Sequence, residues 1–353
     1  MPRIEHVAIA SPRFCFPQSN AKEFVRSLFS AYPDVDRLMQ VFDNANIDQR
    51  YFISDYEWFR APHTFTELNE RYIDEAIALS TEAIQSVLTG AARTIEEIDA
   101  IIFVSTTGIS TPSIDARLFN LLGFNRHIVR IPLWGLGCAG GASAFARAME
   151  YTRAHPDHIV LIVAVEICSL AFQRTLEKEN LIAAALFADG CGAALVCGDH
   201  VTSRAPAYAM PKLLDSLSTI YPDTLNVMGW EITPEGFQVL LSKDIPTIVS
   251  NLVRENIGEL LDRNRLTLGD ITNFVTHPGG TKVLEAYEHS LGLLREAFEH
   301  SYGVLREFGN MSSATIFFIL KRFMESEKDR AGEYGILSAL GPGFSSELVL
   351  VKW

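Results

Sequence analysis

The sequence predicts an α/β fold in which two similar halves form a mixed β-sheet covered by helices on both faces. Strand-like apolar runs alternate with helical segments along the chain, a pattern typical of a largely parallel or mixed sheet. A strand, a glycine turn and a helix of small residues also occur twice, once in each half. With 353 residues, 48% of them hydrophobic and 21% charged, the chain can bury a large core.

The first half begins with a strand-like segment and continues through alternating helices and strands. Residues 64–90 form the clearest predicted helix, because their apolar side chains keep a period of 3.6 and Gly90 suits its end. Residues 100–105 (AIIFVS) predict a buried strand. The other expected elements are a strand at 4–10, a helical region at 21–44, a helix that ends at Leu122, and strands at 128–133, 159–165 and 193–196.

The second half shows the same alternation. Strands are expected at about 206–219 and 227–241, the latter a hairpin that turns at residues 233–236 (TPEG). A helix at 244–261 has Asp244 as its expected N-cap. The remaining elements are a strand at 273–276, a helix after residue 280, a helix at 311–323, and strands at 334–340 and 347–351 on either side of a Gly-Pro-Gly turn.

The two halves repeat one another in the order and spacing of their motifs. Cys138 lies 44 positions after Thr94, and Asn310 lies 43 positions after Thr267, with a TIEEI or TLGDI segment at each threonine. Both turns carry a glycine before the polar residue and small residues after it. We therefore expect a division at 1–205 and 206–353, and a pseudo-twofold arrangement that brings the two turns together near the centre.

Composition excludes several classes of function. A net charge of −13 argues against nucleic-acid binding, which needs a basic face. No apolar run approaches the roughly 20 residues of a membrane span, and residues 1–6 contain no signal-peptide core. Five scattered cysteines without CxxC spacing suit a reducing cytoplasm and predict neither a zinc site nor a disulfide framework. His155 and His158 lie in a polar loop and are interpreted as surface residues, so no metal site is expected.

The stretch 131–151 (IPLWGLGCAGGASAFARAMEY) has the form of a nucleophile elbow. An apolar strand enters a glycine turn, and Cys138 opens a helix of small residues. Free N–H groups and the partial positive charge at a helix N-terminus favour thiolate, the form that a nucleophilic cysteine needs. The alternative is a buried structural cysteine in a core helix rich in glycine and alanine.

His277 and Asn310 are the expected partners of Cys138. A Cys–His pair can exist as thiolate and imidazolium, and an asparagine adds a neutral donor for an enolate or oxyanion. The HPGG segment at 277–280 leaves room for a ligand beside the imidazole ring. A histidine at a strand end is otherwise often structural.

Taken together, five motifs make the sequence resemble the type III polyketide synthases, the chalcone synthase-like branch of the thiolase-fold condensing enzymes. The motifs are GCAGG at 137–141, LFADG at 186–190, HPGG at 277–280, GNMSSA at 309–314 and GPG at 341–343. The resemblance covers nearly the whole chain. It implies a thiolase-like, duplicated αβαβα layered fold, a homodimer in the cytoplasm, and coenzyme A thioesters as substrates with no bound cofactor.

The resemblance also implies a reaction. Cys138 takes an acyl starter from coenzyme A, while His277 and Asn310 assist decarboxylation of malonyl-CoA to the enolate that attacks the acyl group. Repeated two-carbon extension and cyclisation follow. Carrier-protein-dependent ketoacyl synthases are the alternative, but they are expected to carry HQAN-like and NTS-like motifs. A catalytically silent homologue would be expected to lack one of the three residues, and all three are present.

Further residues are assigned to substrate by the same resemblance. Phe187 corresponds to the family's gatekeeper phenylalanine, although ordinary core packing is its alternative. Val239 falls at the second gatekeeper position. The other expected substrate-binding residues are Arg50 at a basic tunnel mouth, Thr106, Thr107, Thr111 (toward the partner subunit), Ala171, Trp230, Gly279, Gly280 and Ser312. The substitutions at 171, 230 and 239 argue against plant chalcone chemistry and leave room for an aliphatic starter and a pyrone or resorcinol product.

Overall fold

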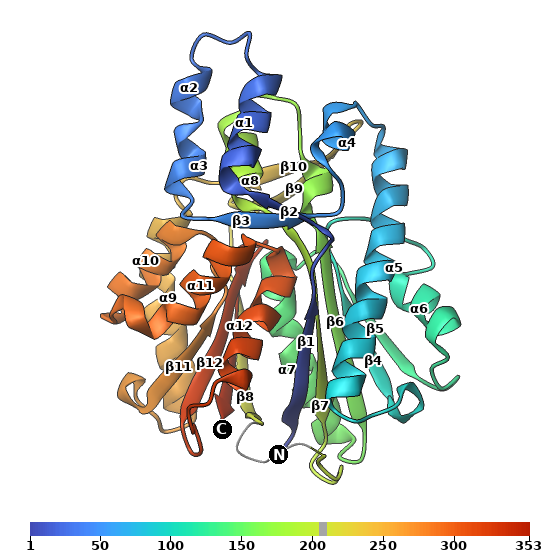
Figure 1. The fold of residues 1–353 in the computed structure, drawn as a ribbon. Coiled ribbons are helices and arrows are strands. Elements are labelled where there is room, and N and C mark those ends of the chain that lie inside the picture. Colours follow the sequence, from blue (N-terminus) through green and yellow to red (C-terminus); the bar gives the residue numbers. More distant parts are fainter. Residues whose placement is uncertain (205–209) are drawn as a thin grey trace.

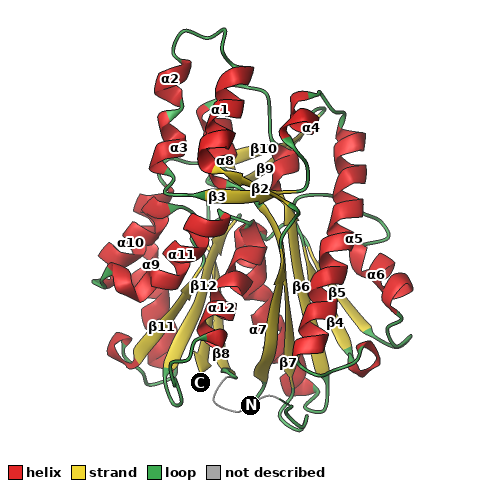
Figure 2. Cartoon of the chain, in the orientation of Figure 1, coloured by secondary structure: helices red, strands yellow, loops and turns green. Residues whose placement is uncertain are grey.

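The computed structural model describes residues 1–204 and 210–353, and its core is a nine-stranded mixed sheet (Figure 1). Figure 2 marks the same strands in yellow. In spatial order they are β11 (Ile271–Thr276), β12 (Tyr334–Gly341), β13 (Ser345–Lys352), β8 (Lys212–Ile220), β1 (Arg3–Ala10), β7 (Asp189–Cys197), β6 (Ile159–Ile167), β4 (Ala100–Val104) and β5 (Val129–Leu133).

The strand pairing repeats between the two halves, as the sequence predicted. In the quartet β11-β12-β13-β8 the first pair is parallel and the next two are antiparallel. The quartet β4-β6-β7-β1 has the same pattern. A single residue pair, Arg3 with Lys212, joins the quartets, and β5 extends the first half by one parallel strand. The predicted boundary between residues 205 and 206 lies outside the described residues.

Helices form three layers around the two half-sheets (Figure 1). The central layer holds α7 (Gly140–Ala154) and α12 (Thr315–Glu325), which share one buried cluster with strands of both halves. Outside the first half lie α5 (Phe65–Gly90) and α6 (Ile114–Leu122). Outside the second half lie α9 (Ile245–Arg263), α10 (Thr281–Leu291) and α11 (Glu299–Phe308). The predicted αβαβα layering is confirmed.

Local sequence explains where these elements begin. Thr64 and Glu67 form a capping box at the start of α5, with the Glu67 carboxylate accepting from the Thr64 N–H at 2.8 Å. Thr94 and Thr267 form matching capping boxes before β4 and β11, so the repeat extends to the caps. Asp244 is the N-cap residue of α9 as expected, but its side chain makes no capping hydrogen bond.

A cap lies over one end of the sheet and holds the hairpin predicted at 227–241 together with several short elements that periodicity missed (Figure 1). The region predicted as helical at 21–44 is three helices, because the chain turns at residues 29–34, where Pro33 disfavours helix in the preceding residue. The cap consists of α1 (Gln18–Leu28), α2 (Val35–Leu38), α3 (Gln40–Asn44), α4 (Tyr56–Arg60), α8 (Lys178–Leu186) and the antiparallel pairs β2 (Phe14–Pro17) with β3 (Gln49–Phe52) and β9 (Met228–Thr233) with β10 (Gly236–Leu241).

Candidate active site

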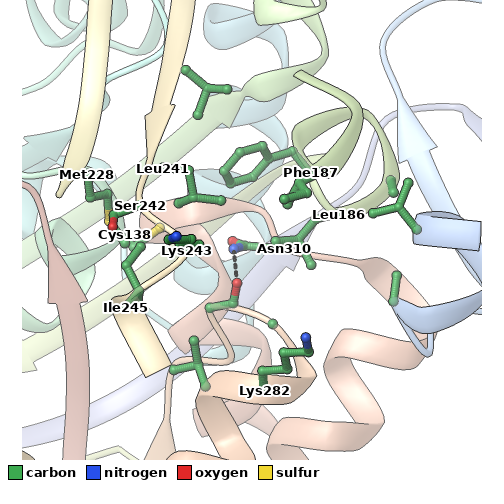
Figure 3. A pocket seen from close by; sticks show the side chains of 18 of the residues that line it. Cys138, Leu186, Phe187, Met228, Leu241, Ser242, Lys243, Ile245, Lys282 and Asn310 are labelled. Carbon is green, nitrogen blue, oxygen red and sulfur yellow. Dashed lines mark hydrogen bonds between the residues drawn. The ribbon is translucent and has the colours of Figure 1, made fainter. Parts of the chain in front are cut away.

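A cavity of about 550 Å³ opens beneath the cap, and Cys138, His277 and Asn310 all line it. The cysteine comes from the turn before α7, the histidine from the end of β11, and the asparagine from the loop before α12. Figure 3 shows Cys138, Phe187 and Asn310 around this cavity. The structure therefore brings together the three residues that the sequence analysis chose as reacting groups.

The turn that presents Cys138 is tightly packed. Gly137 has a φ of +48°, and a Cβ there would lie 2.6 Å from Pro342, so both conformation and space favour glycine. A Cβ at Gly141 would lie 2.3 Å from the backbone oxygen of Ser313. The small residues after Cys138 thus allow α7 to approach the turn that carries Ser312 and Ser313. This contact places the two matching turns side by side.

Burial controls the protonation of the two titratable groups. It raises the pKa of the Cys138 thiol to about 12, and Glu166 adds to the rise, although the Ser312 and Asn310 side chains oppose it. Burial also lowers the pKa of His277 to about 3. Both directions favour a thiol beside a neutral imidazole. The thiolate–imidazolium pair expected from the sequence is therefore not the state that burial favours in the ligand-free site.

His277 and Asn310 keep polar atoms available to a ligand. The backbone N–H of His277 donates to the Ser338 carbonyl at 2.8 Å, but neither ring nitrogen has a partner among the described residues. Asn310 Oδ1 accepts from the Ser312 N–H at 2.8 Å, which orients the amide, and Nδ2 makes a long hydrogen bond of 3.5 Å to the Gly279 carbonyl. An unpaired buried ring nitrogen is costly, so a ligand oxygen at this point would be stabilised.

Phe187 is tied to the same loop as Asn310. The Asn310 N–H donates to the Leu186 carbonyl, and the Ala188 N–H donates to the Asn310 carbonyl, each at 2.9 Å. These bonds hold the phenylalanine on the cavity wall, where its ring centroid lies 6.1 Å from that of Trp230. Val239 is the cross-strand neighbour of Trp230 and also lines the cavity.

The remaining predicted substrate residues divide into two groups. Ser312, Gly279 and Gly280 line the main cavity with Phe187, Trp230 and Val239. Five residues do not line it: Arg50, Thr106, Thr107, Thr111 and Ala171.

Local contacts explain where these five residues lie, and only the placement of Arg50 at the mouth is contradicted. Thr106 and Thr107 turn their hydroxyls onto the buried carboxylate of Glu166, at 2.9 and 3.0 Å. Thr111 is exposed on the surface of this chain. Arg50 is 2% exposed rather than at a mouth, and Ala171 lines a separate small cavity beside it.

Glu166 was not recognised from sequence, although one signal was present. It is the only charged residue in the strand Ile159–Ile167, which is buried throughout. A carboxylate in such a strand requires donors. Here they are the Thr106 N–H and the hydroxyls of Thr106, Thr107 and Ser313, the last at 2.5 Å. Burial still raises the pKa of Glu166 above its ordinary value.

The cavity mouth is basic, but its cations are not the predicted one. Four exposed cationic side chains line it, no acidic residue does, and none of the four forms an ion pair in the described part of the chain. They are Arg37, Lys178, Lys243 and Lys282. They come from four separate segments, so no local sequence pattern could have grouped them.

Comparison with known proteins agrees with this architecture. Residues 5–200 match the family model "Chalcone and stilbene synthases, N-terminal domain", and residues 212–353 match the corresponding C-terminal domain. A protein of Bacillus subtilis named "Putative chalcone synthase" is 42% identical, over 98% of this chain and 97% of its own length. The 1,3,6,8-tetrahydroxynaphthalene synthase of Streptomyces peucetius is 33% identical, over 98% and 92%.

Solved structures show the same fold over the whole chain. The 1,3,6,8-tetrahydroxynaphthalene synthase of Streptomyces coelicolor superimposes with a TM-score of 0.89 at 29% identity, covering 99% of both chains. The C-terminal type III polyketide synthase domain of Steely1 from Dictyostelium gives 0.92 at 25% identity, with the same coverage.

Proposed function

On the premise that this chain belongs to the chalcone and stilbene synthase family of type III polyketide synthases, we propose that Cys138, His277 and Asn310 are its catalytic residues. One observation carries the proposal. A buried thiol, an imidazole whose two nitrogens have no partner among the described residues, and an oriented amide line a single cavity with a basic mouth. That set of groups suits thioester exchange and enolate stabilisation.

The first step is transfer of the acyl starter. The Cys138 sulfur attacks the carbonyl carbon of an acyl-CoA while a nitrogen of neutral His277 takes the thiol proton. The tetrahedral intermediate collapses, the bond to the CoA sulfur breaks, and the leaving thiolate takes the proton back. A neutral imidazole is the form competent to act as base, and burial favours that form in the ligand-free site.

The second step is decarboxylative condensation. The carbonyl oxygen of malonyl-CoA accepts hydrogen bonds from His277 and from Nδ2 of Asn310, and loss of CO2 leaves an enolate held by the same donors. The enolate carbon attacks the acyl carbonyl on Cys138, the carbon–sulfur bond breaks, and the Cys138 thiolate that leaves takes one proton from solvent water. The acyl chain is then two carbons longer and bound to CoA.

The mouth suits coenzyme A. The four exposed cations face no acidic residue in the cavity lining, so they are available to the phosphate groups of the nucleotide end. Much of the interior wall is apolar: Leu186, Phe187, Met228 and Leu241 line the cavity, and Figure 3 shows Leu186 and Leu241 on either side of Phe187. An aliphatic starter and a pyrone or resorcinol product therefore remain our proposal for the substrate class.

A homodimer is the proposed assembly. β5 pairs with β4 on one side and is one of the two edge strands of the sheet, the other being β11. Val129 on β5 and Trp134, which directly follows it, are exposed apolar side chains, as are Ile109 before α6 and Leu121 on α6. Edge strands of this kind pair readily with another chain, and exposed Thr111 lies in the same region of sequence.

We place the enzyme in the cytoplasm, which suits five unpaired cysteines. No helix in the described residues has the length and hydropathy needed to cross a membrane.

Product analysis tests the proposed function. The purified protein is incubated with malonyl-CoA and acyl-CoA starters of increasing length, and products are identified by mass spectrometry. We expect CO2 release and starter-dependent polyketides with free CoA esters. Turnover confined to starters and extenders bound to acyl-carrier protein would instead support the ketoacyl synthase alternative.

A further inference from the structure

A second cavity, of about 60 Å³, lies on the other side of Phe187. Phe187 lines both cavities and therefore lies between them. Most of the second lining is aromatic or small, including Phe24, Phe59 and Ala171. Ser169 also lines it and donates its hydroxyl to the Asp189 carboxylate at 2.6 Å. Two larger polar side chains, Arg50 and Tyr56, complete the polar lining.

Each of these two larger polar side chains has a buried atom without a partner among the described residues. Arg50 uses Nε to donate to Gln18 Oε1 at 2.9 Å and Nη1 to donate to the Phe187 carbonyl at 2.7 Å. Its Nη2 donates to nothing, and the Tyr56 hydroxyl likewise has no partner. Two orphaned donors that line one cavity indicate a missing acceptor.

The charge at this point is also unbalanced. Burial lowers the pKa of Arg50 to about 10, which leaves the guanidinium charged near neutral pH. Arg50 forms no ion pair in the described part of the chain. The nearby Asp189 carboxylate raises the pKa of Arg50 but accepts its own hydrogen bonds from the Ile53 N–H and from Ser169. A buried cation without a paired anion is unfavourable, so a ligand carboxylate would be stabilised here.

We propose that this second cavity, defined by Arg50, Tyr56, Phe59, Ala171 and Phe187, is a subsite for the far end of an acyl group, and that it takes a terminal carboxylate. The carboxylate accepts from Arg50 Nη2 and from the Tyr56 hydroxyl, while the adjoining methylene groups contact the aromatic wall. Entry requires the Phe187 ring to turn aside. The proposal rests on the proposed function, because the acyl group reaches the subsite from Cys138.

Tyr56→Phe is the most selective variant for a test. The hydroxyl that it removes has no partner in the described chain, so the substitution takes away no internal hydrogen bond. Arg50 is less suitable because its Nη1 also holds the Phe187 carbonyl. Tyr51→Phe is the matched control, since Tyr51 lies on the same strand as Arg50 but does not line the second cavity.

The measurement is equilibrium binding by calorimetry to the Cys138→Ala protein, which needs no turnover. Linear ω-carboxyacyl-CoA esters are compared with alkanoyl-CoA esters of equal carbon number, over about four to eight carbons. We expect one chain length at which the carboxylate tightens binding about tenfold or more, as hydrogen bonds to a charged group allow. Adding Tyr56→Phe should abolish most of that gain and leave alkanoyl-CoA binding unchanged, whereas Tyr51→Phe should change neither.

Two results would overturn the subsite. One is the absence of any chain length at which the carboxylate helps. The other is a Tyr56→Phe effect of equal size on both ester series, which would mean that the two donors are satisfied by internal water. The proposed function is tested separately, with the unsubstituted protein, and it fails if that protein forms no acyl-enzyme and no polyketide with any ester. The binding comparison requires neither an acyl-enzyme nor a polyketide, so the two failures can be told apart.

Discussion

At the scale of single residues, the fold orients the reacting side chains and leaves some of their polar atoms available to a substrate. His277 is held only by its backbone, and both ring nitrogens are left for a ligand. Asn310 is oriented by Ser312 so that Nδ2 remains a donor. Motif spacing predicted these residues because glycine-rich turns mark them. It could not show that Thr106 and Thr107 donate to Glu166, because this carboxylate is far away in sequence.

The pH dependence of stability reports on His277. Its pKa falls on folding from an ordinary value of about 6.5 to about 3, so between these values the unfolded chain binds more protons. The titration of His277 therefore lowers the free energy of unfolding as the pH falls below about 6.5 and does not change it above that pH. Thermal unfolding at about pH 7.5 and pH 5 should show a larger loss for the unsubstituted protein than for His277→Gln, whose side chain does not titrate.

The opposite ordering would contradict this account of the ligand-free site. A thiolate–imidazolium pair raises the folded-state pKa of His277 above 6.5, so the histidine would then stabilise the folded protein at the lower pH. In that case His277→Gln would lose more stability than the unsubstituted protein between the same two conditions.

At the scale of elements, the two central helices, α7 and α12, follow the turns that carry Cys138 and Asn310 and pack in one buried cluster. The predicted strands and long helices were correct where their periodicity was strong, as for α5 and the buried strands of the sheet. The short cap strands β2 and β3 and the cap helices α4 and α8 were missed, because segments of four to nine residues outside the main sheet carry little periodic signal. The cap supplies two of the four mouth cations, Arg37 and Lys178, so the missed elements matter for substrate.

Gly141→Ala tests the contact between the two matching turns. The added methyl group would lie 2.3 Å from a backbone oxygen that cannot move freely, so we expect a loss of about 1–3 kcal/mol in the free energy of unfolding. Activity should fall as well, because the turn carrying Ser312 must shift relative to Cys138. Chemical denaturation and turnover assays measure both.

Gly258→Ala is the matched control. Gly258 lies inside α9, and a Cβ there meets nothing within 4 Å. Alanine should leave activity unchanged and stabilise the helix by up to about 1 kcal/mol. Equal effects of the two substitutions would mean that close packing at Gly141 does not matter.

At the scale of the whole molecule, the duplicated sheet explains why two similar turns carry different residues of one site. The repeat was predictable from sequence because Thr94 and Thr267 begin matching segments. The basic mouth was not predictable from sequence, because it depends on how the cap helices, the β9–β10 hairpin and α10 meet around the cavity. Arg50 was assigned to that mouth, and its burial could not be inferred from the polar residues Asp48 and Gln49 before it.

The open edge at β5 predicts how the molecule assembles. Trp134 is 57% exposed beside this edge, and a charge there should disfavour pairing with a second copy. We expect the unsubstituted protein to sediment as a dimer and Trp134→Glu to sediment largely as a monomer. Leu225→Glu, at an 82% exposed leucine elsewhere, should remain dimeric. Dimers of unchanged strength in Trp134→Glu would exclude this edge as the interface.

The most direct test of the central claim is the intact mass of the protein after brief exposure to an acyl-CoA in the absence of malonyl-CoA. The account predicts that the unsubstituted protein gains the mass of one acyl group, and that Cys138→Ala, with an unchanged circular dichroism spectrum, gains none. Acylation that persists in Cys138→Ala would contradict the claim that Cys138 is the nucleophile of this polyketide synthase.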